Sequence, residues 1–226
     1  MEILTWTDPK YFRFCNALMR SIRYNENEHL IHLNLLDFNE EQFNLVQEMY
    51  KNDSKIHFIR TNYRQFKGKY AVNKHNKIPF YQNHRPRFFL EYLEKSKDGK
   101  LCTFGANGII FSKLDFIENH LDEKDFVFLE RQKNNIWTDS PKQVSGIDDL
   151  QDMVKQGLNL DKILDTTTGK VVLLGTHAMK NNDVCKDVLN RWIKLVENTE
   201  SMNVTYSDMN YFVKSVIQYQ MEKVRR

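Results

Sequence analysis

The sequence LIHLNLL at residues 30–36 is a short, mostly apolar run, and two similar runs flank it: EILTW at residues 2–6 and KIHFI at residues 55–59. Short apolar runs of this length are typical of strands. Between them, apolar residues recur at helical spacing over residues 9–23 and again from Asn39 to Tyr50. This alternation of strand and helix predicts parallel strands joined by helical crossovers.

Two polar residues indicate where these helices begin. Asp8 precedes Pro9, which predicts that Asp8 caps the first helix and that Pro9 takes its first helical position. Asn39 stands before the second periodic segment and predicts its start.

The remainder of the chain continues the α/β pattern with longer polar interruptions. Residues 60–82 lack a sustained apolar period and are interpreted as a long loop, after which Pro86 indicates the first turn of a helix from Asn83 or Arg85. The later expectations are a strand at 101–104, an apolar run at 109–111, a short helix at 114–121, a strand at 126–129, a short helix near 148–156, a strand at 171–175 and two closing helices at 183–198 and 207–223.

Composition limits the class of protein. The 226 residues fit a single domain, 1–226, and a net charge of only +3 disfavours a nucleic-acid binder. Three widely spaced cysteines suggest free thiols in a reducing compartment. No apolar run is long enough to cross a bilayer, and no signal peptide is visible, so a cytoplasmic protein is expected.

One segment resembles a known family. The strand-like residues 100–104, the turn Gly105-Ala106-Asn107-Gly108, the apolar run 109–111 and the helix start at Leu114-Asp115 are similar to the central segment of the GT-A nucleotide-sugar glycosyltransferases. In that family the strand ends in an Asp-x-Asp motif. Here Gly105 and Asn107 stand where the two aspartates belong, so the motif is degenerate.

The resemblance implies a fold and separate roles for the two halves of the chain. It implies a GT-A-like, Rossmann-like α/β fold with a mixed, mostly parallel sheet flanked by helices and with two C-terminal helices. Residues 1–130 would be the half that binds the nucleotide sugar. Residues 131–226 would contribute the acceptor half and the closing helices.

The same resemblance assigns residues to a donor such as a UDP-sugar or a GDP-sugar. Thr7 or Asp8, at the end of the first strand, would contact the nucleoside, although Asp8 serves equally well as a helix cap. Ala106 and Asn107 would lie at the diphosphate. Lys69 and Arg85 belong to a basic segment, 60–87, whose charges suit a diphosphate or are simply solvated.

Metal binding is open at this point. The family commonly uses Mn²⁺ or Mg²⁺, which prefer anionic oxygen ligands. Gly105 offers no side chain and Asn107 offers one neutral amide oxygen. Three explanations compete: the donor phosphates hold the metal, basic side chains replace it and the enzyme is metal-independent, or catalysis is lost and binding is retained.

The acceptor side rests on looser similarity. Residues 173–182 resemble the glycine-containing strand that lines the acceptor pocket, which implies acceptor contacts at Gly175 and Thr176. His177 is either a phosphate or metal ligand or a structural residue. An inverting enzyme needs a carboxylate base, for which the candidates are Glu130, Asp139 and Asp208, and Asp208 would also suit a first helical turn. A retaining enzyme needs no such base.

Three functions follow from these observations. The first is a glycosyltransferase that moves a sugar from a nucleotide diphosphate to an unknown acceptor. The second is an inactive GT-A-like domain that binds a nucleotide sugar or a glycan. The third is a nucleic-acid-associated protein that uses the aromatic and basic residues of 60–87, and the small net charge makes it the weakest.

Overall fold

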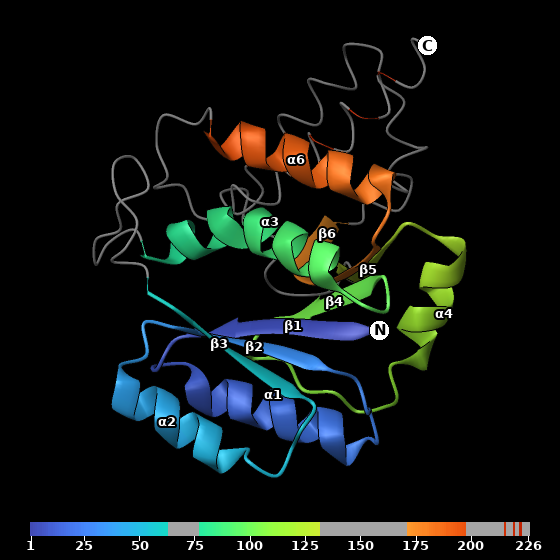
Figure 1. Cartoon of the computed structure of the whole chain (residues 1–226). Coiled ribbons are helices and arrows are strands. Elements are labelled where there is room, and N and C mark those ends of the chain that lie inside the picture. Colours follow the sequence, from blue (N-terminus) through green and yellow to red (C-terminus); the bar gives the residue numbers. More distant parts are fainter. Residues whose placement is uncertain (63–76, 132–170, 198–214, 216–218, 220–221, 223–226) are drawn as a thin grey trace. The chain divides into compact units, whose positions relative to one another are not determined.

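The computed structural model describes residues 1–62, 77–131 and 171–197 together with residues 215, 219 and 222, and for 77–83, 128–131 and 171–175 it describes the backbone alone. The elements of this part of the chain, labelled in Figure 1, are β1 (Glu2–Thr7), α1 (Phe12–Tyr24), β2 (Ile31–Leu36), α2 (Glu40–Met49), β3 (Ile56–Thr61), α3 (Lys77–Lys95), β4 (Lys100–Phe104), α4 (Asp115–Glu123), β5 (Phe126–Arg131), β6 (Val171–Lys180) and α6 (Asp183–Glu197).

The strands form one mixed, mostly parallel sheet, as predicted. Its six strands follow the order β3-β2-β1-β4-β6-β5. The pairs β1–β2, β2–β3 and β1–β4 are parallel, whereas β4 and β6 are antiparallel. Because the four strands β1 to β4 are parallel, their carboxyl ends share one edge of the sheet, and β6 begins at that same edge.

The chain divides into two compact units. The first consists of Met1–Lys67, Tyr92–Val127 and Gly175–Asn182, and the second of Gly68–Glu91, Phe128–Leu174 and Asp183–Arg226. The first unit therefore contains β1 to β4, the helices α1, α2 and α4, and the last six residues of β6. The candidate site described below is confined to this unit.

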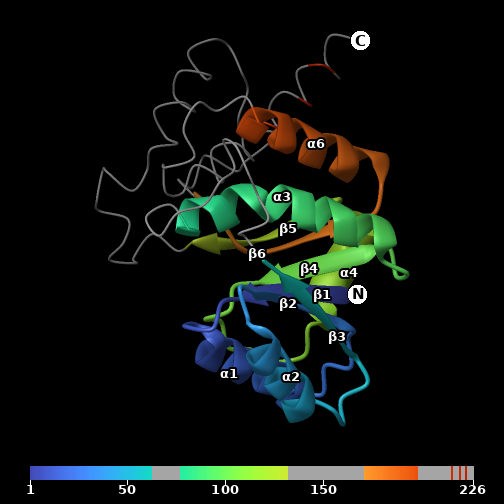
Figure 2. The ribbon, with the colours of Figure 1, turned by 60° about the vertical axis from the view of Figure 1, so that its left-hand side comes forward.

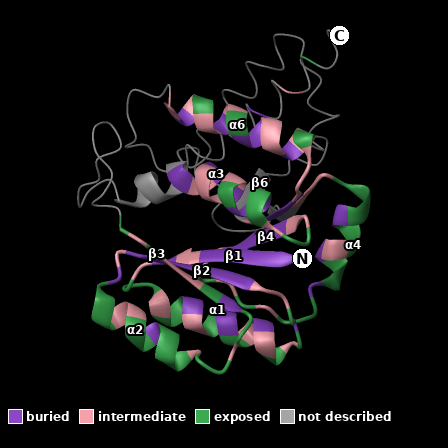
Figure 3. Ribbon diagram, viewed as in Figure 1, coloured by how far each residue is buried: buried purple, intermediate pink, exposed green. Residues whose placement is uncertain are grey.

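Helices α1 and α2 cover one face of strands β1 to β3, as the two views in Figures 1 and 2 agree. Alternate strand residues, including Ile3, Leu33 and Leu35, point toward these helices and are fully buried. Leu18 and Ile22 of α1 complete this core, and Figure 3 shows β1 and β2 largely buried, whereas the outer faces of α1 and α2 are exposed. Hydrophobic burial of this kind holds α1 and α2 to the sheet.

The opposite face of the same strands carries a chain of polar side chains, of which Glu2 and His32 are buried and His57 is exposed. Glu2 accepts a hydrogen bond from His32 (Oε2 to Nε2, 2.5 Å), and the Nδ1 atoms of His32 and His57 lie 3.2 Å apart. Burial raises the pKa of Glu2, but the hydrogen bonds from His32 and from the backbone N–H of Lys97 outweigh it, so the pKa of this carboxyl is lowered. Tyr92 packs on His32, with ring centroids 5.1 Å apart.

The start of α1 differs from the prediction. The helix begins at Phe12, three residues after Pro9, because Asp8 and Pro9 form a separate turn before it. In that turn the Asp8 side chain accepts a hydrogen bond from the Tyr11 N–H (3.0 Å). The N-cap of α1 is Tyr11, without a side-chain cap, so the prediction that Asp8 caps the helix is wrong. The predicted start of α2 is confirmed, since Asn39 forms a capping box with Gln42.

The start of α3 was predicted wrongly. The helix begins at Lys77, so Pro86 lies in its interior and not in its first turn, and residues 77–82 are not a loop. Proline is accommodated best in the first turn of a helix, so Pro86 favoured a later start in the sequence. Neighbouring structure can nevertheless support a proline inside a helix. The remainder of the expected loop, residues 63–76, lies outside the described residues.

The second unit contains most of α3 and all of α6. The predicted helix at 183–198 is confirmed as α6, which buries Val188, Leu189 and Trp192. Arg87 of α3 forms an ion pair with Glu197 at the end of α6. Residues 215, 219 and 222 are helical, while the other residues of the helix expected at 207–223 and the short helix expected near 148–156 lie outside the described residues. Among the helices that the structure describes, none has the length and apolar character to span a bilayer.

Candidate functional site

The site lies where β1 and β4 end and β6 begins. In the sheet, Leu4 of β1 pairs with Thr103 of β4, and Phe104 pairs with Thr176 of β6. The buried Thr5 hydroxyl donates a hydrogen bond to the Phe104 carbonyl (2.9 Å) and so ties the end of β1 to the end of β4. The loops after β1 and β4 therefore leave the sheet side by side, at the edge where open α/β sheets bind ligands.

The loop after β4 is a tight turn over Gly105–Gly108. The Gly108 N–H donates to the Gly105 carbonyl (2.9 Å), which leaves Ala106 and Asn107 at the two central positions. A Cβ added at Gly108 would lie 3.2 Å from the Gly105 oxygen, so the turn is close at that position. Ala106 is partly exposed and Asn107 is exposed, so both central residues face solvent at the carboxyl edge.

Thr7 and Asp8 lie beside this turn but differ in their freedom to meet a ligand. Thr7 is buried, and its hydroxyl donates to the Asp8 carbonyl (3.1 Å). Asp8 is partly exposed, and one carboxylate oxygen accepts a hydrogen bond from the Tyr11 N–H. The N-terminus of α1 follows within a few residues, and its first turn contains no acidic side chain. Its partial positive charge is therefore available at this edge.

Strand β6 brings the predicted acceptor residues to the same place. Because β6 runs antiparallel to β4, Gly175 and Thr176 lie opposite the end of β4, although they are more than 70 residues away in sequence. His177 lies one position further into the sheet, opposite Thr103, and is only 1% exposed. Its Nδ1 atom lies 3.0 Å from the Thr103 hydroxyl, a position that favours the structural role weighed for this histidine.

A side-chain site for Mn²⁺ or Mg²⁺ is not formed by the described residues of this edge. Gly105 contributes no side chain and Asn107 contributes a neutral amide, whereas hard cations prefer carboxylates. In the part of the chain that the structure describes, no group of three or more His, Cys, Asp or Glu side chains could hold a metal ion. The residues present therefore do not fit a protein-held cation at the turn.

Several sequence-predicted residues are not brought to this edge by the described structure. Lys69, Asp139 and Asp208 lie outside the described residues, and for Glu130 only the backbone is described, within β5. Arg85 was expected at the N-terminal end of its helix, but α3 starts at Lys77, so that placement is wrong. Arg85 belongs to the second unit and lies inside the helix.

Two polar contacts at this edge were missed in the sequence. The Thr5–Phe104 hydrogen bond is one. The other joins β2 to β3: the Asn34 side-chain oxygen accepts from the Thr61 hydroxyl (2.8 Å), and Asn34 is only 1% exposed. An asparagine near the end of the apolar run LIHLNLL was the one available signal, since a polar residue inside a buried strand needs a partner.

Comparison with known proteins identifies the fold. The galactosyltransferase LgtC in complex with donor and acceptor sugar analogues aligns over 96% of this chain and 70% of its own, with a TM-score of 0.56 at 14% identity. GlyE of Streptococcus pneumoniae TIGR4 aligns over 93% of this chain (TM-score 0.52, 15% identity), and the mannosyltransferase Ktr4p of S. cerevisiae over 96% (TM-score 0.52, 12% identity). No family model and no curated protein matches the sequence.

These likenesses show that the chain has the fold of the GT-A-type glycosyltransferases, as the resemblance implied. At identities of 12–15% the likeness is one of fold. The chain spans 41% of the length of GlyE and 64% of that of Ktr4p.

Proposed function

We propose that this protein transfers a sugar from a nucleotide-diphosphate donor to an acceptor hydroxyl. One observation carries the proposal: the Gly105–Gly108 turn ends β4 at the carboxyl edge of the sheet, between the end of β1 and the start of β6. LgtC, whose structure contains donor and acceptor sugar analogues, has a similar fold.

The donor would be a UDP-sugar or a GDP-sugar whose diphosphate lies at this turn. The turn's own hydrogen bond uses the N–H of Gly108 and leaves those of Ala106 and Asn107 to meet phosphate oxygens. The N-terminus of α1 would add positive potential. Thr7 and Asp8 would lie toward the nucleoside, and Gly175 and Thr176 toward the acceptor.

The charge of the diphosphate is offset without carboxylate-held metal in this proposal. Peptide N–H groups and the N-terminus of α1 would offset part of the diphosphate charge. Lys69 and Arg85 are the basic side chains that the sequence suggests for the remainder. If Mn²⁺ or Mg²⁺ accompanies the donor, phosphate oxygens would be its principal ligands.

The reaction breaks the bond between the anomeric carbon of the donor sugar and the diphosphate oxygen, and forms a bond from that carbon to the acceptor oxygen. The acceptor loses a proton and the nucleoside diphosphate leaves with an added negative charge. In an inverting reaction a carboxylate takes the proton, and Glu130, Asp139 and Asp208 are the candidates. A retaining reaction would not need them.

A second candidate function is binding of a nucleotide sugar or glycan without transfer. The exposed Asn107 favours it, because this residue supplies a neutral amide where the family has a carboxylate. Transfer and binding alone predict the same affinity for donor and differ only in turnover.

Calorimetric titration with UDP, GDP and their sugars, in EDTA and then in Mn²⁺, tests the common part of both candidates. Binding of at least one nucleoside diphosphate is expected, and its absence in both buffers would overturn the proposal. Release of free sugar or nucleoside diphosphate from the bound donor, above the rate without protein, would then favour transfer. Bound donor that stays intact with a panel of acceptor glycans would favour the binding role.

A further inference from the structure

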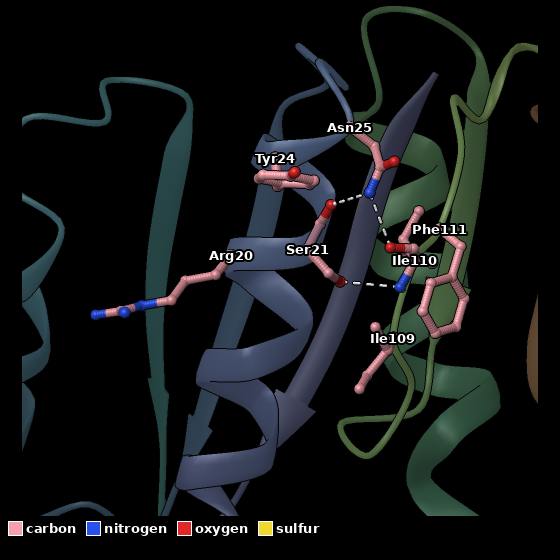
Figure 4. A pocket seen from close by; sticks show the side chains of 7 residues that line it. All are labelled: Arg20, Ser21, Tyr24, Asn25, Ile109, Ile110 and Phe111. Carbon is pink, nitrogen blue, oxygen red and sulfur yellow. Dashed lines mark hydrogen bonds between the residues drawn. The ribbon is translucent and has the colours of Figure 1, made fainter.

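Residues 109–114, which follow the turn of the candidate site, are held to the end of α1 by side chains. The Ile110 N–H donates to the Ser21 hydroxyl (2.9 Å), and the Asn25 amide donates to the Ile110 carbonyl (2.9 Å). Figure 4 shows Ser21 and Asn25 reaching from α1 to the backbone of Ile110. The N–H and the carbonyl of Ile110 are thus both hydrogen-bonded to side chains at the end of α1 and not to a neighbouring strand.

Asn27 holds the next part of the same segment. Its amide nitrogen donates to the Ser112 carbonyl (3.2 Å), and its oxygen accepts from the Leu114 N–H (2.8 Å). Asn27 is 3% exposed, so these contacts are protected from water. The backbone of residues 110–114 is therefore fixed at several points.

This anchoring leaves large apolar side chains in solvent. Phe111 is 85% exposed and Ile109 is 54% exposed, on either side of the anchored Ile110. Exposed single apolar residues are ordinary, but these two adjoin Tyr24, which is 86% exposed. Together with Arg20 they line an open pocket of about 400 Å³, in which the polar groups of Ser21 and Asn25 are already engaged.

The outer face of α1 continues this surface and is basic. Arg13, Ala17, Arg20 and Tyr24 are spaced along one line of the helix and are all exposed. Helix α1 contains no acidic residue, whereas α2 beside it carries Glu40, Glu41 and Glu48. Phe14 lies under the Arg13 guanidinium, whose carbon is 4.6 Å from the ring centroid.

We propose that this surface, formed by the exposed face of α1 together with Ile109 and Phe111, binds the surface of an anionic lipid bilayer. Phenylalanine, tyrosine and isoleucine side chains enter the boundary between headgroups and acyl chains, and arginines pair with lipid phosphates. The basic charge of α1 complements an anionic surface and selects it over a neutral one. The proposal is independent of donor binding, because none of these residues belongs to the candidate site.

Co-sedimentation of the full chain with vesicles tests it. Vesicles of phosphatidylcholine with phosphatidylglycerol are expected to bind the protein, and vesicles of phosphatidylcholine alone to bind it weakly. Replacing both arginines (Arg13→Gln with Arg20→Gln) should weaken binding about fivefold per charge. The pair Ile109→Ser with Phe111→Ser should weaken it at least about tenfold.

Helix α2 offers a matched control. Leu45 and Met49 are 61% and 51% exposed, so Leu45→Ser with Met49→Ser removes similar apolar area from a helix of opposite charge. The control should bind vesicles as the parent does. All variants should keep the parent's urea midpoint, since every changed side chain is exposed.

Three results would overturn the proposal: no binding to anionic vesicles, an equal loss in the α2 control, or binding that survives both sets of α1-surface substitutions. Sedimentation velocity supplies a further outcome. If Phe111→Ser dissociates a dimer and leaves vesicle binding unchanged, this surface is an interface between copies of the chain and the bilayer proposal is wrong.

Discussion

Asn107 stands where the GT-A glycosyltransferases that this segment resembles have an aspartate. Changing it to Asp places a carboxylate at the exposed centre of the turn. If the diphosphate lies there, Asn107→Asp should weaken binding of UDP or GDP about fivefold in EDTA, because like charges repel. In Mn²⁺ the same variant should bind the nucleotide more tightly than the parent, because the new carboxylate supplies an anionic ligand. Calorimetry in the two buffers measures both effects.

Asn119 provides the same chemical change elsewhere. It is an exposed residue of α4, so Asn119→Asp adds one negative charge without touching the turn. Its nucleotide affinity should match that of the parent in both buffers. Equal behaviour of the two variants would show that the turn does not hold the diphosphate.

His84, on α3, should make the free energy of unfolding depend on pH. Burial and the neighbouring Arg87 guanidinium lower the pKa of His84 to about 4 from its usual value of 6.5. As the pH falls below 6.5, the unfolded chain takes up this proton before the folded chain does, so the free energy of unfolding decreases until about pH 4. The full effect is about 3 kcal/mol from this group.

Urea denaturation of the parent and of His84→Gln between pH 7.5 and pH 4 measures this dependence. The variant should lose part of the decrease, because its side chain does not titrate. His57 and His29 also have lowered pKa values, through burial above all, and they contribute in the same direction in both proteins. A variant with the same slope as the parent would show that folding does not lower the pKa of His84.

At the scale of elements, Asn27 is the most deeply buried of the side chains that anchor residues 109–114. Asn27→Ala removes hydrogen bonds to Ile22, Ser112 and Leu114 and leaves buried peptide groups unpaired. The free energy of unfolding should fall by about 2–4 kcal/mol. Hydrogen exchange should be accelerated at the Leu114 amide, while amides of β1 and β2 exchange no faster than the loss of global stability explains.

The control is Asn44→Ala on the exposed face of α2. Alanine suits a helix interior at least as well as asparagine, so stability should change by no more than about 0.5 kcal/mol. A comparable loss in both variants would mean that Asn27 contributes as an ordinary surface residue.

Local patterns predicted the elements whose boundaries are marked by local residues. The runs at 2–6, 30–36 and 55–59 became β1, β2 and β3, and Asn39 capped α2 as expected. Prediction failed where packing outweighed the local signal. Pro86 indicated a helix start but lies inside α3, and the strand expected at 171–175 continues to Lys180 because it pairs with β4.

The candidate site was predictable in outline. The chain order of strands and helices placed the loops after β1 and β4 at one edge, and this is where Asp8 and Asn107 lie. The Thr5–Phe104 and Asn34–Thr61 hydrogen bonds could not be predicted, since each joins residues distant in sequence whose meeting depends on strand register. The apolar run at 109–111 forms no strand in the described structure.

At the scale of the whole molecule, donor binding should raise thermal stability. A ligand that binds only the folded chain adds about 2.7 kcal/mol at a concentration 100 times its Kd. The melting temperature should therefore rise with UDP or GDP, and EDTA should not abolish the rise, because the turn has no carboxylate ligands for a metal. Differential scanning fluorimetry over a nucleotide series measures the shift.

Adenosine diphosphate and free phosphate serve as comparisons in that series. A shift of the same size with every phosphate compound would indicate a general anion effect and not a nucleotide site. Complete loss of the shift in EDTA would show that a cation is required for donor binding, and the proposed metal-independent compensation would be wrong.

Side chains of Ser21, Asn25 and Asn27, in α1 and the turn after it, hold the backbone of residues 110–114 by hydrogen bonds. Positions 109, 111 and 113 consequently contribute little to the folding of their own segment, and the ion pair of Lys113 with Glu26 is exposed. A lineage can exchange the residues at these three positions with little penalty in folding. A few codon changes can thus alter the chemistry of this exposed surface while the backbone of the adjoining turn stays constant.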